Sequence, residues 1–135
     1  MTQQPLKSIL LIDDSKTVRT FVTAVLADAG WQVEAVESIT QGLARLARDA
    51  SDLVLLDVGL PGANIEQLVP AISGRESQAN TIVILFSGES EDELERITER
   101  CGAHGYLQKT NDSEQLRRQI QSLWNRLAGP RRVEA

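Results

Sequence analysis

Three short runs of almost unbroken apolar residues most strongly limit what this chain can fold into. They occupy residues 9–12, 53–56 and 82–86. Runs of this length suit β-strands and are too short for ordinary helices. A strand that is apolar on both faces must be covered on both sides, which is typical of the central strands of a parallel sheet. The sequence therefore predicts a sheet buried between two layers of helices.

The segments between these runs carry apolar residues at helical spacing, three or four positions apart. Members of this pattern are Val18, Phe21, Val22, Val25 and Leu26, then Ile39, Leu43 and Leu46, then Ile65, Leu68, Val69 and Ile72, then Leu94 and Ile97, and finally Leu116, Ile120, Leu123, Trp124 and Leu127. Weaker strand signals at residues 31–36 and 106–107 complete five alternating strand and helix units. Such alternation predicts an α/β fold with a doubly wound parallel sheet, because right-handed crossovers place helices on both faces.

Polar residues and glycines mark where these helices begin and end. Ser90 starts the segment SEDE, which has the form of a capping box, and Ser113 is a candidate cap for the last helix. Gly30, Gly74 and Gly129 are candidate helix stops. We therefore expect one domain over residues 7–128, with an N-terminal tail at 1–6 and a C-terminal tail or linker stub at 129–135.

Composition narrows the classes of partner. The chain has 135 residues, 41% hydrophobic and 24% charged, with a formal net charge of -5, which favours one globular domain and disfavours a general binder of nucleic acid or membrane surfaces. Its only cysteine is Cys101, so it cannot form an internal disulfide. Residues 1–8 lack the apolar core of a signal peptide. No apolar run approaches the roughly 20 residues that span a bilayer. These features favour the cytoplasm and a protein partner, without membrane attachment or direct DNA binding.

Polar residues stand where the predicted strands end. Asp13 and Asp14 follow the first strand, Asp57 the third, Ser87 the fourth and Lys109 the fifth. Ligands of open parallel sheets bind at the carboxyl ends of the strands, so we expect these side chains to converge. Several carboxylates brought together raise one another's cost of ionisation unless a cation sits among them. Because Mg²⁺ prefers oxygen ligands, the sequence predicts a magnesium site.

Asp57 can then act as a nucleophile toward phosphorus, a recognised use of carboxylates. Phosphoryl transfer mainly requires positioning of the reacting groups and neutralisation of charge on the phosphoryl oxygens. The ammonium of Lys109 and the hydroxyl of Ser87 suit that task, and Gly88 leaves space beside Ser87 for the incoming group.

These residues resemble the receiver domains of two-component response regulators. The likeness covers about residues 7–127 and rests on the segments LLIDDS, LVLLDVGLPG, TIVILFSG and GAHGYLQKT. It implies a flavodoxin-like (βα)5 fold with strand order 2-1-3-4-5, resembling the single-domain chemotaxis regulators. It also implies a sensor histidine kinase or phosphotransfer protein as phosphodonor, a downstream protein target, and a monomer in the unphosphorylated state.

The resemblance also assigns roles to individual residues. Asp57 would be the phosphoacceptor, and Asp13 and Asp14 would bind the metal together with the backbone carbonyl of Gly59. Ser87 and Lys109 would contact the phosphoryl group. Tyr106 would be the switch aromatic that changes rotamer as Ser87 is drawn in, and the fourth helix, fifth strand and fifth helix would dock the target.

Two alternatives stay open at this point. A receiver-like module that never takes phosphate would have lost an acidic or lysine position, and none is lost here. A cofactor binder or an aspartate-dependent phosphatase could use the same fold. However, Asp13 and Asp14 would meet a flavin phosphate where it needs backbone amides, and Gly59 stands where such a phosphatase has its second aspartate. The isomer of the Lys109–Thr110 bond is also open, because many receivers have Pro in place of Thr110.

Overall fold

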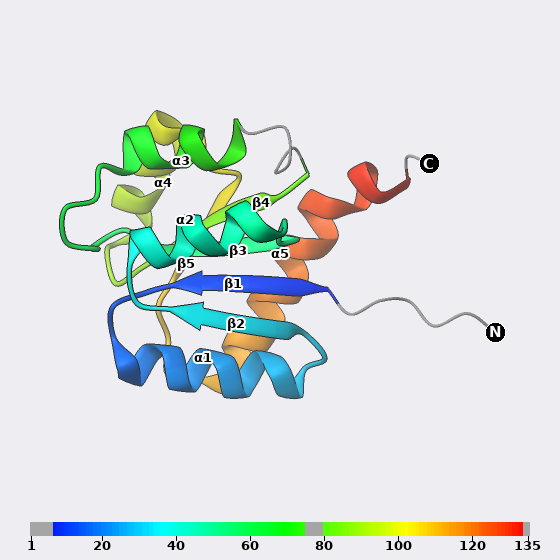
Figure 1. The fold of residues 1–135 in the computed structure, drawn as a ribbon. Helices are drawn as coiled ribbons and strands as arrows, with labels where there is room; N and C mark the ends of the chain where they lie inside the picture. Colours follow the sequence, from blue (N-terminus) through cyan, green and yellow to red (C-terminus); the bar gives the residue numbers. More distant parts are fainter. Residues whose placement is uncertain (1–6, 75–79, 134–135) are drawn as a thin grey trace.

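The protein folds into alternating strands and helices (Figure 1). A computed structural model describes residues 7–74 and 80–133, with side chains up to residue 128. The predicted N-terminal tail at 1–6 lies outside the described residues. The elements are β1 (Ser8–Ile12), α1 (Lys16–Asp28), β2 (Gln32–Val36), α2 (Ile39–Arg48), β3 (Leu53–Asp57), α3 (Ile65–Ser73), β4 (Ile82–Ser87), α4 (Glu91–Cys101), β5 (Gly105–Gln108) and α5 (Ser113–Val133).

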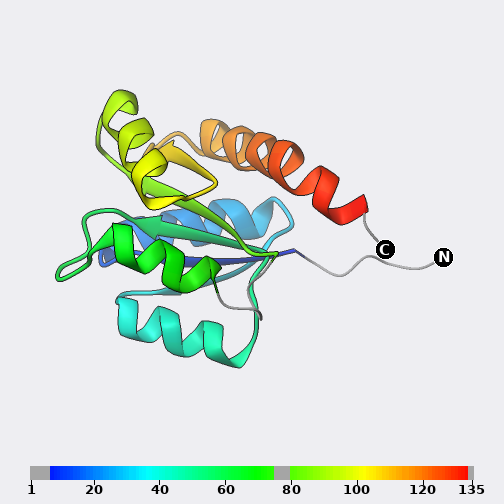
Figure 2. The same ribbon diagram turned by 90° about the horizontal axis from the view of Figure 1, so that it is seen from above.

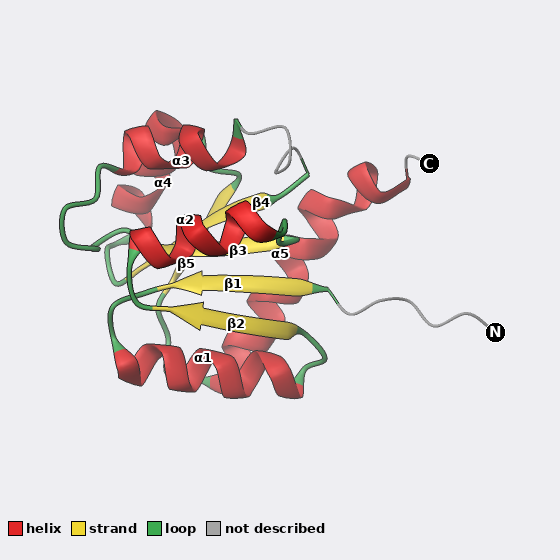
Figure 3. Cartoon of the chain, viewed as in Figure 1, coloured by secondary structure: helices red, strands yellow, loops and turns green. Residues whose placement is uncertain are grey.

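The five strands form one parallel sheet in the order β2-β1-β3-β4-β5, which confirms the predicted fold class and strand order. Every residue of β3 and β4 is buried, as the unbroken apolar runs predicted. Because all strands run the same way, their carboxyl ends share one edge of the sheet; Figure 3 shows the arrowheads of β1 and β2 at that edge.

Two hydrophobic cores lie on opposite faces of the sheet. One core joins Leu11, Leu55 and Ile84 to apolar side chains of α1 and α5. The other joins Leu10, Val54 and Leu85 to α2, α3 and α4. Alternate residues of a strand point to opposite faces, so each central strand contributes to both cores. Figure 2 shows α5 and α2 on opposite sides of the sheet.

Helix starts agree with the prediction at Ser90 and differ from it at Ser113. The Ser90 hydroxyl accepts a hydrogen bond from the backbone N–H of Glu93 at 3.2 Å. At α5 the cap is Asp112, whose carboxylate accepts from the N–H groups of residues 114 and 115 at 3.0 and 3.2 Å. The Ser113 prediction is therefore wrong by one position. An aspartate caps as well as a serine does and adds favourable charge at the helix N-terminus.

Helix ends agree with the prediction at Gly30 and Gly74 and differ from it at Gly129. Gly30 follows α1 with a φ of 100°, a conformation that favours glycine. Helix α5 does not stop at Gly129 but continues to Val133. A glycine permits a helix to end without forcing it to, since a helical glycine costs only about 1 kcal/mol relative to alanine. The boundary predicted at residue 128 falls within this helix, and the extent of the domain stays a prediction.

The two weaker strands also differ slightly from their predicted ranges. Strand β2 begins at Gln32, and the ring of Trp31 instead packs edge-on against Trp124, with 5.5 Å between centroids. Strand β5 is one residue longer at each end than predicted. The described residues contain no cis peptide bond, so the Lys109–Thr110 bond is trans.

His104 directly precedes β5 and forms two hydrogen bonds with Val83 of β4. Its backbone N–H donates to the carbonyl of Val83 at 2.9 Å, and its ring nitrogen Nδ1 accepts from the N–H of Val83 at 3.0 Å. Val83 is fully buried. The imidazole thus supplies the acceptor that a strand carbonyl would otherwise provide.

We expect His104→Ala to lower the free energy of unfolding by about 1–3 kcal/mol, because it leaves the buried N–H of Val83 without that acceptor. Urea denaturation would measure the loss. His104→Asn offers an oxygen at the position of Nδ1 and should recover most of it. Equal losses in both variants would contradict the role given to Nδ1.

Candidate functional site

Asp13 is a fully buried carboxylate at the end of β1. The Ser15 N–H donates to its Oδ1 at 2.9 Å, and the same serine caps α1 by accepting from the N–H of Val18. The guanidinium of Arg19 donates to the backbone carbonyl of Asp13 at 2.9 Å. The start of α1 therefore holds this carboxylate in place, while the neighbouring Asp14 is exposed. Arg19 was not predicted from the sequence.

Asp57 ends β3 and is 5% exposed. Its Oδ1 accepts a hydrogen bond from the backbone N–H of Gly59 at 3.0 Å, which fixes the orientation of the carboxylate. Burial raises the pKa of Asp57 above its ordinary value, and the nearby Asp13 adds to the rise, while the Gly59 N–H and the charge of Lys109 act in the opposite direction.

Lys109 reaches across from the end of β5 to both aspartates. Its Nζ lies 2.8 Å from Oδ2 of Asp13 and 3.5 Å from Oδ1 of Asp57. The ammonium also lies 5.6 Å from the centre of the Phe86 ring, a distance at which cations are attracted to aromatic faces. One cation therefore balances part of the charge of two buried carboxylates.

Ser87 ends β4 beside this cluster and is 6% exposed. Its hydroxyl accepts from the N–H of Glu89 at 3.2 Å, and its carbonyl accepts from the N–H of Lys109 at 2.8 Å. Between them, Gly88 has no neighbouring atom within 4 Å of the position that a Cβ would take. The predicted open space beside the hydroxyl is therefore present.

Tyr106 lies on β5, two positions before the residue that pairs with Ser87. It pairs with Leu85, whereas Ser87 pairs with Gln108. Leu85 and Ser87 point to the same face of β4 because they are two residues apart, so Tyr106 and Ser87 share that face. The phenol is partly buried and packs against the core between the sheet and α4.

The acidic cluster fits a hard metal ion. Asp13, Asp14 and Asp57 each offer one carboxylate oxygen, and the three oxygens lie within 4.8 Å of one another. Oδ2 of Asp13 is buried, and its described polar contact is the ion pair with the ammonium of Lys109 at 2.8 Å. Oxygen donors grouped in this way suit Mg²⁺ or Ca²⁺. The pocket is able to bind a metal ion at the carboxyl edge of the sheet.

Fold and site together define a flavodoxin-like α/β domain with an acidic pocket at the carboxyl ends of its strands. A model of the response regulator receiver domain family matches residues 9–121. The chain belongs to this family, whose members work with histidine kinases and downstream targets in two-component signal transduction.

Individual relatives agree with this assignment. The chain is 30% identical over 116 residues to protein PilH of Pseudomonas aeruginosa, a match covering 85% of this chain and 95% of PilH. It is 32% identical over 101 residues to the transcriptional regulatory protein HprR of Escherichia coli, covering 75% of this chain and 44% of HprR.

Among solved structures, the chemotaxis response regulator CheY4 of Vibrio cholerae superimposes with a TM-score of 0.80 at 26% identity. This match covers 88% of this chain and 99% of CheY4.

Among the described residues, no helix is both long enough and apolar enough to pass through a membrane.

Proposed function

We propose that this receiver accepts a phosphoryl group on Asp57 from a histidine kinase or phosphotransfer protein and signals through a surface formed by α4, β5 and α5. The observation that carries the proposal is the position of Lys109. Its ammonium contacts Asp57 and Asp13 at 3.5 and 2.8 Å, and Ser87, followed by the open position at Gly88, ends the neighbouring strand β4. A nucleophile and groups that can balance phosphoryl charge thus stand at the carboxyl ends of three neighbouring strands, β3, β4 and β5.

In the transfer, a carboxylate oxygen of Asp57 forms a bond to phosphorus while the bond between phosphorus and the donor breaks. The bonding electron pair leaves with the donor, which takes up a proton, and the product is an aspartyl phosphate. The Gly59 N–H orients the carboxylate, and Lys109 and Ser87 contact the phosphoryl oxygens. The protein catalyses only its own phosphorylation and dephosphorylation, and acts on no separate substrate.

Asp13, Asp14, Asp57 and the backbone carbonyl of Gly59 are the groups that would hold Mg²⁺. Once bound, the cation supplies positive charge that neutralises the phosphoryl oxygens during transfer. Support comes from the grouped carboxylate oxygens and from the buried Oδ2 of Asp13, which already contacts a cation, the ammonium of Lys109. Labelling of the wild-type protein with acetyl phosphate, with and without Mg²⁺, tests this function. Labelling that proceeds equally without a divalent ion would contradict it.

Ser87 and Tyr106 act as one two-state element in this proposal. They share a face of neighbouring strands, so a Ser87 hydroxyl drawn toward a phosphoryl group vacates space toward which the Tyr106 ring can turn. The change would reach α4, against which Tyr106 packs, and so alter the output surface.

Ser87→Ala should therefore still accept phosphate on Asp57 but respond less on the α4, β5 and α5 surface. We expect the phosphorylation-dependent amide shifts of that surface to fall by half or more. Nuclear magnetic resonance of phosphorylated wild-type and variant protein would compare them. Ser73→Ala, which removes a hydroxyl on α3, is the matched control. Shifts of wild-type size in Ser87→Ala would contradict the coupling.

Output then runs through contact with another protein, and the unphosphorylated receiver is a monomer that does not bind DNA. The net charge of -5 supports this view, because DNA attracts basic surfaces. Helix α4 carries acidic residues and α5 carries arginines, so both charge signs adjoin on the output surface. Such charges steer encounter, and association with the target should slow as salt is raised.

A further inference from the structure

The loop between β4 and α4, residues 88–90, connects Ser87 to the first turn of α4, and its residues are exposed. Gln108 of β5 is the only described side chain from outside this loop that forms a hydrogen bond with the loop backbone. Its Nε2 donates to the carbonyl of Glu89 at 2.9 Å. The position of the β4–α4 loop relative to β5 therefore depends on this side chain.

Both backbone polar groups of Glu89 are engaged. Its N–H donates to the hydroxyl of Ser87 at 3.2 Å, and its carbonyl accepts from Gln108. Gln108 stands opposite Ser87 in the register of β4 and β5, and the next residue, Lys109, donates its backbone N–H to the Ser87 carbonyl at 2.8 Å. The ends of the two strands and the loop thus share a set of hydrogen bonds that includes the Ser87 hydroxyl.

This set of hydrogen bonds must change when Ser87 turns toward a phosphoryl group. A hydroxyl that moves to another staggered rotamer leaves its former partner, so the N–H of Glu89 loses its acceptor and the loop backbone is released. The backbone bond from Lys109 keeps β5 in register, so Gln108 stays in place while the loop moves. The hydrogen bond from Gln108 therefore favours the described position of the loop.

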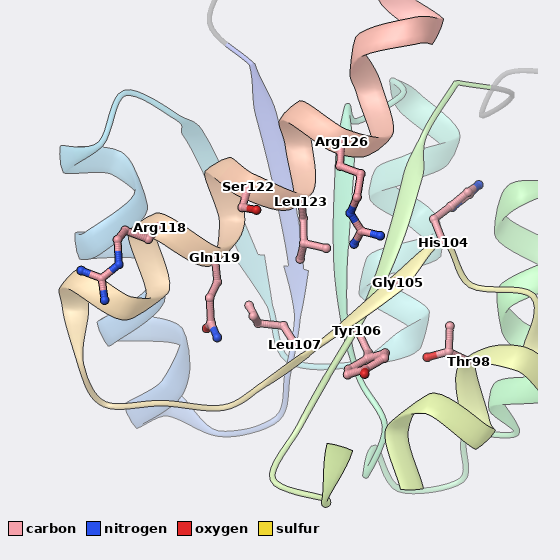
Figure 4. A pocket seen from close by; sticks show the side chains of 10 residues that line it. All are labelled: Thr98, His104, Gly105, Tyr106, Leu107, Arg118, Gln119, Ser122, Leu123 and Arg126. Carbon is pink, nitrogen blue, oxygen red and sulfur yellow. The ribbon is translucent and has the colours of Figure 1, made fainter. Parts of the chain in front are cut away.

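The α4 side of this switch contains an unsatisfied polar atom. Tyr106 packs against the core between the sheet and α4, and Figure 4 shows the side-chain oxygen of Thr98 directed toward its ring. This Oγ1 is buried and forms no hydrogen bond with a described group. A buried oxygen without a partner is unfavourable. The hydrogen bond from Gln108 helps to offset this cost and so to keep the described conformation populated.

We propose that Gln108 is a positioning residue that holds the β4–α4 loop in the unphosphorylated conformation and so sets how readily the receiver switches. Loss of its hydrogen bond destabilises that conformation alone, so more molecules occupy the conformation that binds a phosphoryl group. The inference rests on the proposed function in taking Asp57 as the phosphoacceptor and Ser87 with Tyr106 as the switch.

Gln108→Met tests the proposal, because it keeps the length of the side chain and removes the N–H donor. Beryllofluoride with Mg²⁺ is the probe, since it has the shape and charge of a phosphoryl group. We expect the variant to bind beryllofluoride about threefold to tenfold more tightly than the wild type, the factor that one net hydrogen bond supplies. Titration at saturating Mg²⁺, followed by nuclear magnetic resonance, would measure both affinities. General damage to the site would lower the affinity instead.

Gln121→Met is the matched control. The Nε2 of Gln121 also donates a hydrogen bond of 2.9 Å, to Oδ1 of Asn125 on the exposed face of α5. The control variant removes the same chemical group and adds the same exposed methionine, away from the β4–α4 loop. It should bind beryllofluoride like the wild type.

A second measurement needs no phosphoryl group. Relaxation dispersion of the metal-free, unphosphorylated protein detects exchange between its major and minor conformations. In Gln108→Met, the minor population reported by the amides of Ser87 and Tyr106 should rise by the same factor as the affinity. The amide signal of Ser90 should also shift, because this N–H shares a peptide unit with the carbonyl that has lost its hydrogen bond.

Three outcomes would overturn the proposal. In a wild type that binds beryllofluoride, these are weaker or unchanged binding by Gln108→Met, an equal gain in Gln121→Met, or a minor population that does not rise in Gln108→Met. Acetyl phosphate labelling separates the two hypotheses. If the wild type is labelled but Gln108→Met shows no gain, only the role of Gln108 fails. If the minor population rises in Gln108→Met while the wild type is neither labelled nor binds beryllofluoride, Gln108 does hold the loop and only the phosphorylation proposal fails.

Discussion

Asp57→Asn is expected to reduce labelling by acetyl phosphate to background while leaving the fold intact. The amide keeps the shape of the carboxylate and can still accept the hydrogen bond from the Gly59 N–H, which is 3.0 Å long in the wild type. It is not a nucleophile toward phosphorus, so the transfer loses its acceptor. Intact-mass measurement after incubation with Mg²⁺ would detect the phosphoryl group directly.

The matched control for this substitution is Asp49→Asn, which changes an exposed aspartate at the end of α2, remote from the site. It should be labelled like the wild type. Labelling that persists in Asp57→Asn would contradict the assignment of the phosphoacceptor, and the labelled residue would then have to be sought among the other carboxylates.

The same variant also has an expected effect on stability. Because burial raises the pKa of Asp57, ionisation of this group destabilises the metal-free fold. The wild type should lose stability as the pH rises from the ordinary carboxyl range through the raised pKa, and Asp57→Asn should lack that loss. Urea denaturation in chelator should therefore find the variant more stable at neutral pH and no different well below the ordinary carboxyl pKa.

The sequence predicts the strands of this fold better than its helix boundaries. Runs such as residues 53–56 can only be satisfied by burial on both faces, so their place in the sheet centre follows from composition alone. Helix boundaries depend on which of several adequate residues is used. Asp112 and Ser113 are both good caps, and Gly129 is compatible with either a stop or a further turn, so local preference does not decide between them.

The sequence predicts which residues form the site, but it does not predict which of their side chains contact one another. The carboxyl edge of a parallel sheet necessarily brings Asp13, Asp57 and Lys109 together. That Lys109 lies closer to Asp13 than to Asp57 depends on rotamers of a long side chain, which no sequence pattern encodes. The contact between Arg19 and the carbonyl of Asp13 depends in the same way on the direction of α1.

The contact between Lys109 and Asp13 leads to the second large expected effect. Lys109→Met should raise the affinity for Mg²⁺ and slow the phosphorylation of Asp57. Lys109 contacts Oδ2 of Asp13, the buried oxygen that is otherwise available to a metal ion. The ammonium and a divalent cation therefore compete for this oxygen. Lys109→Met keeps much of the aliphatic side chain and removes the charge, so Mg²⁺ should bind several-fold more tightly, as calorimetric titration would measure.

Phosphorylation should respond in the opposite way. Lys109 is proposed to contact the phosphoryl oxygens, and loss of one such charged group typically slows transfer about 100-fold or more. The rate of acetyl phosphate labelling at saturating Mg²⁺ should therefore fall by that factor in Lys109→Met, although the variant binds the metal more tightly. This combination separates a direct role of the ammonium in transfer from a role in metal binding alone, which would raise the Mg²⁺ affinity and leave the rate at saturating Mg²⁺ unchanged.

Lys16→Met is the matched control, because it removes an exposed lysine from the first turn of α1, at the same edge of the sheet. It lowers the net charge by the same amount, so any gain in Mg²⁺ affinity that it shows reports general electrostatic attraction. The gain in Lys109→Met must exceed this value, since only Lys109 contacts an oxygen of the acidic cluster among the described lysines. Equal gains in the two variants would show that the ammonium does not compete with the metal, and labelling of Lys109→Met at the wild-type rate would show that it does not assist the transfer.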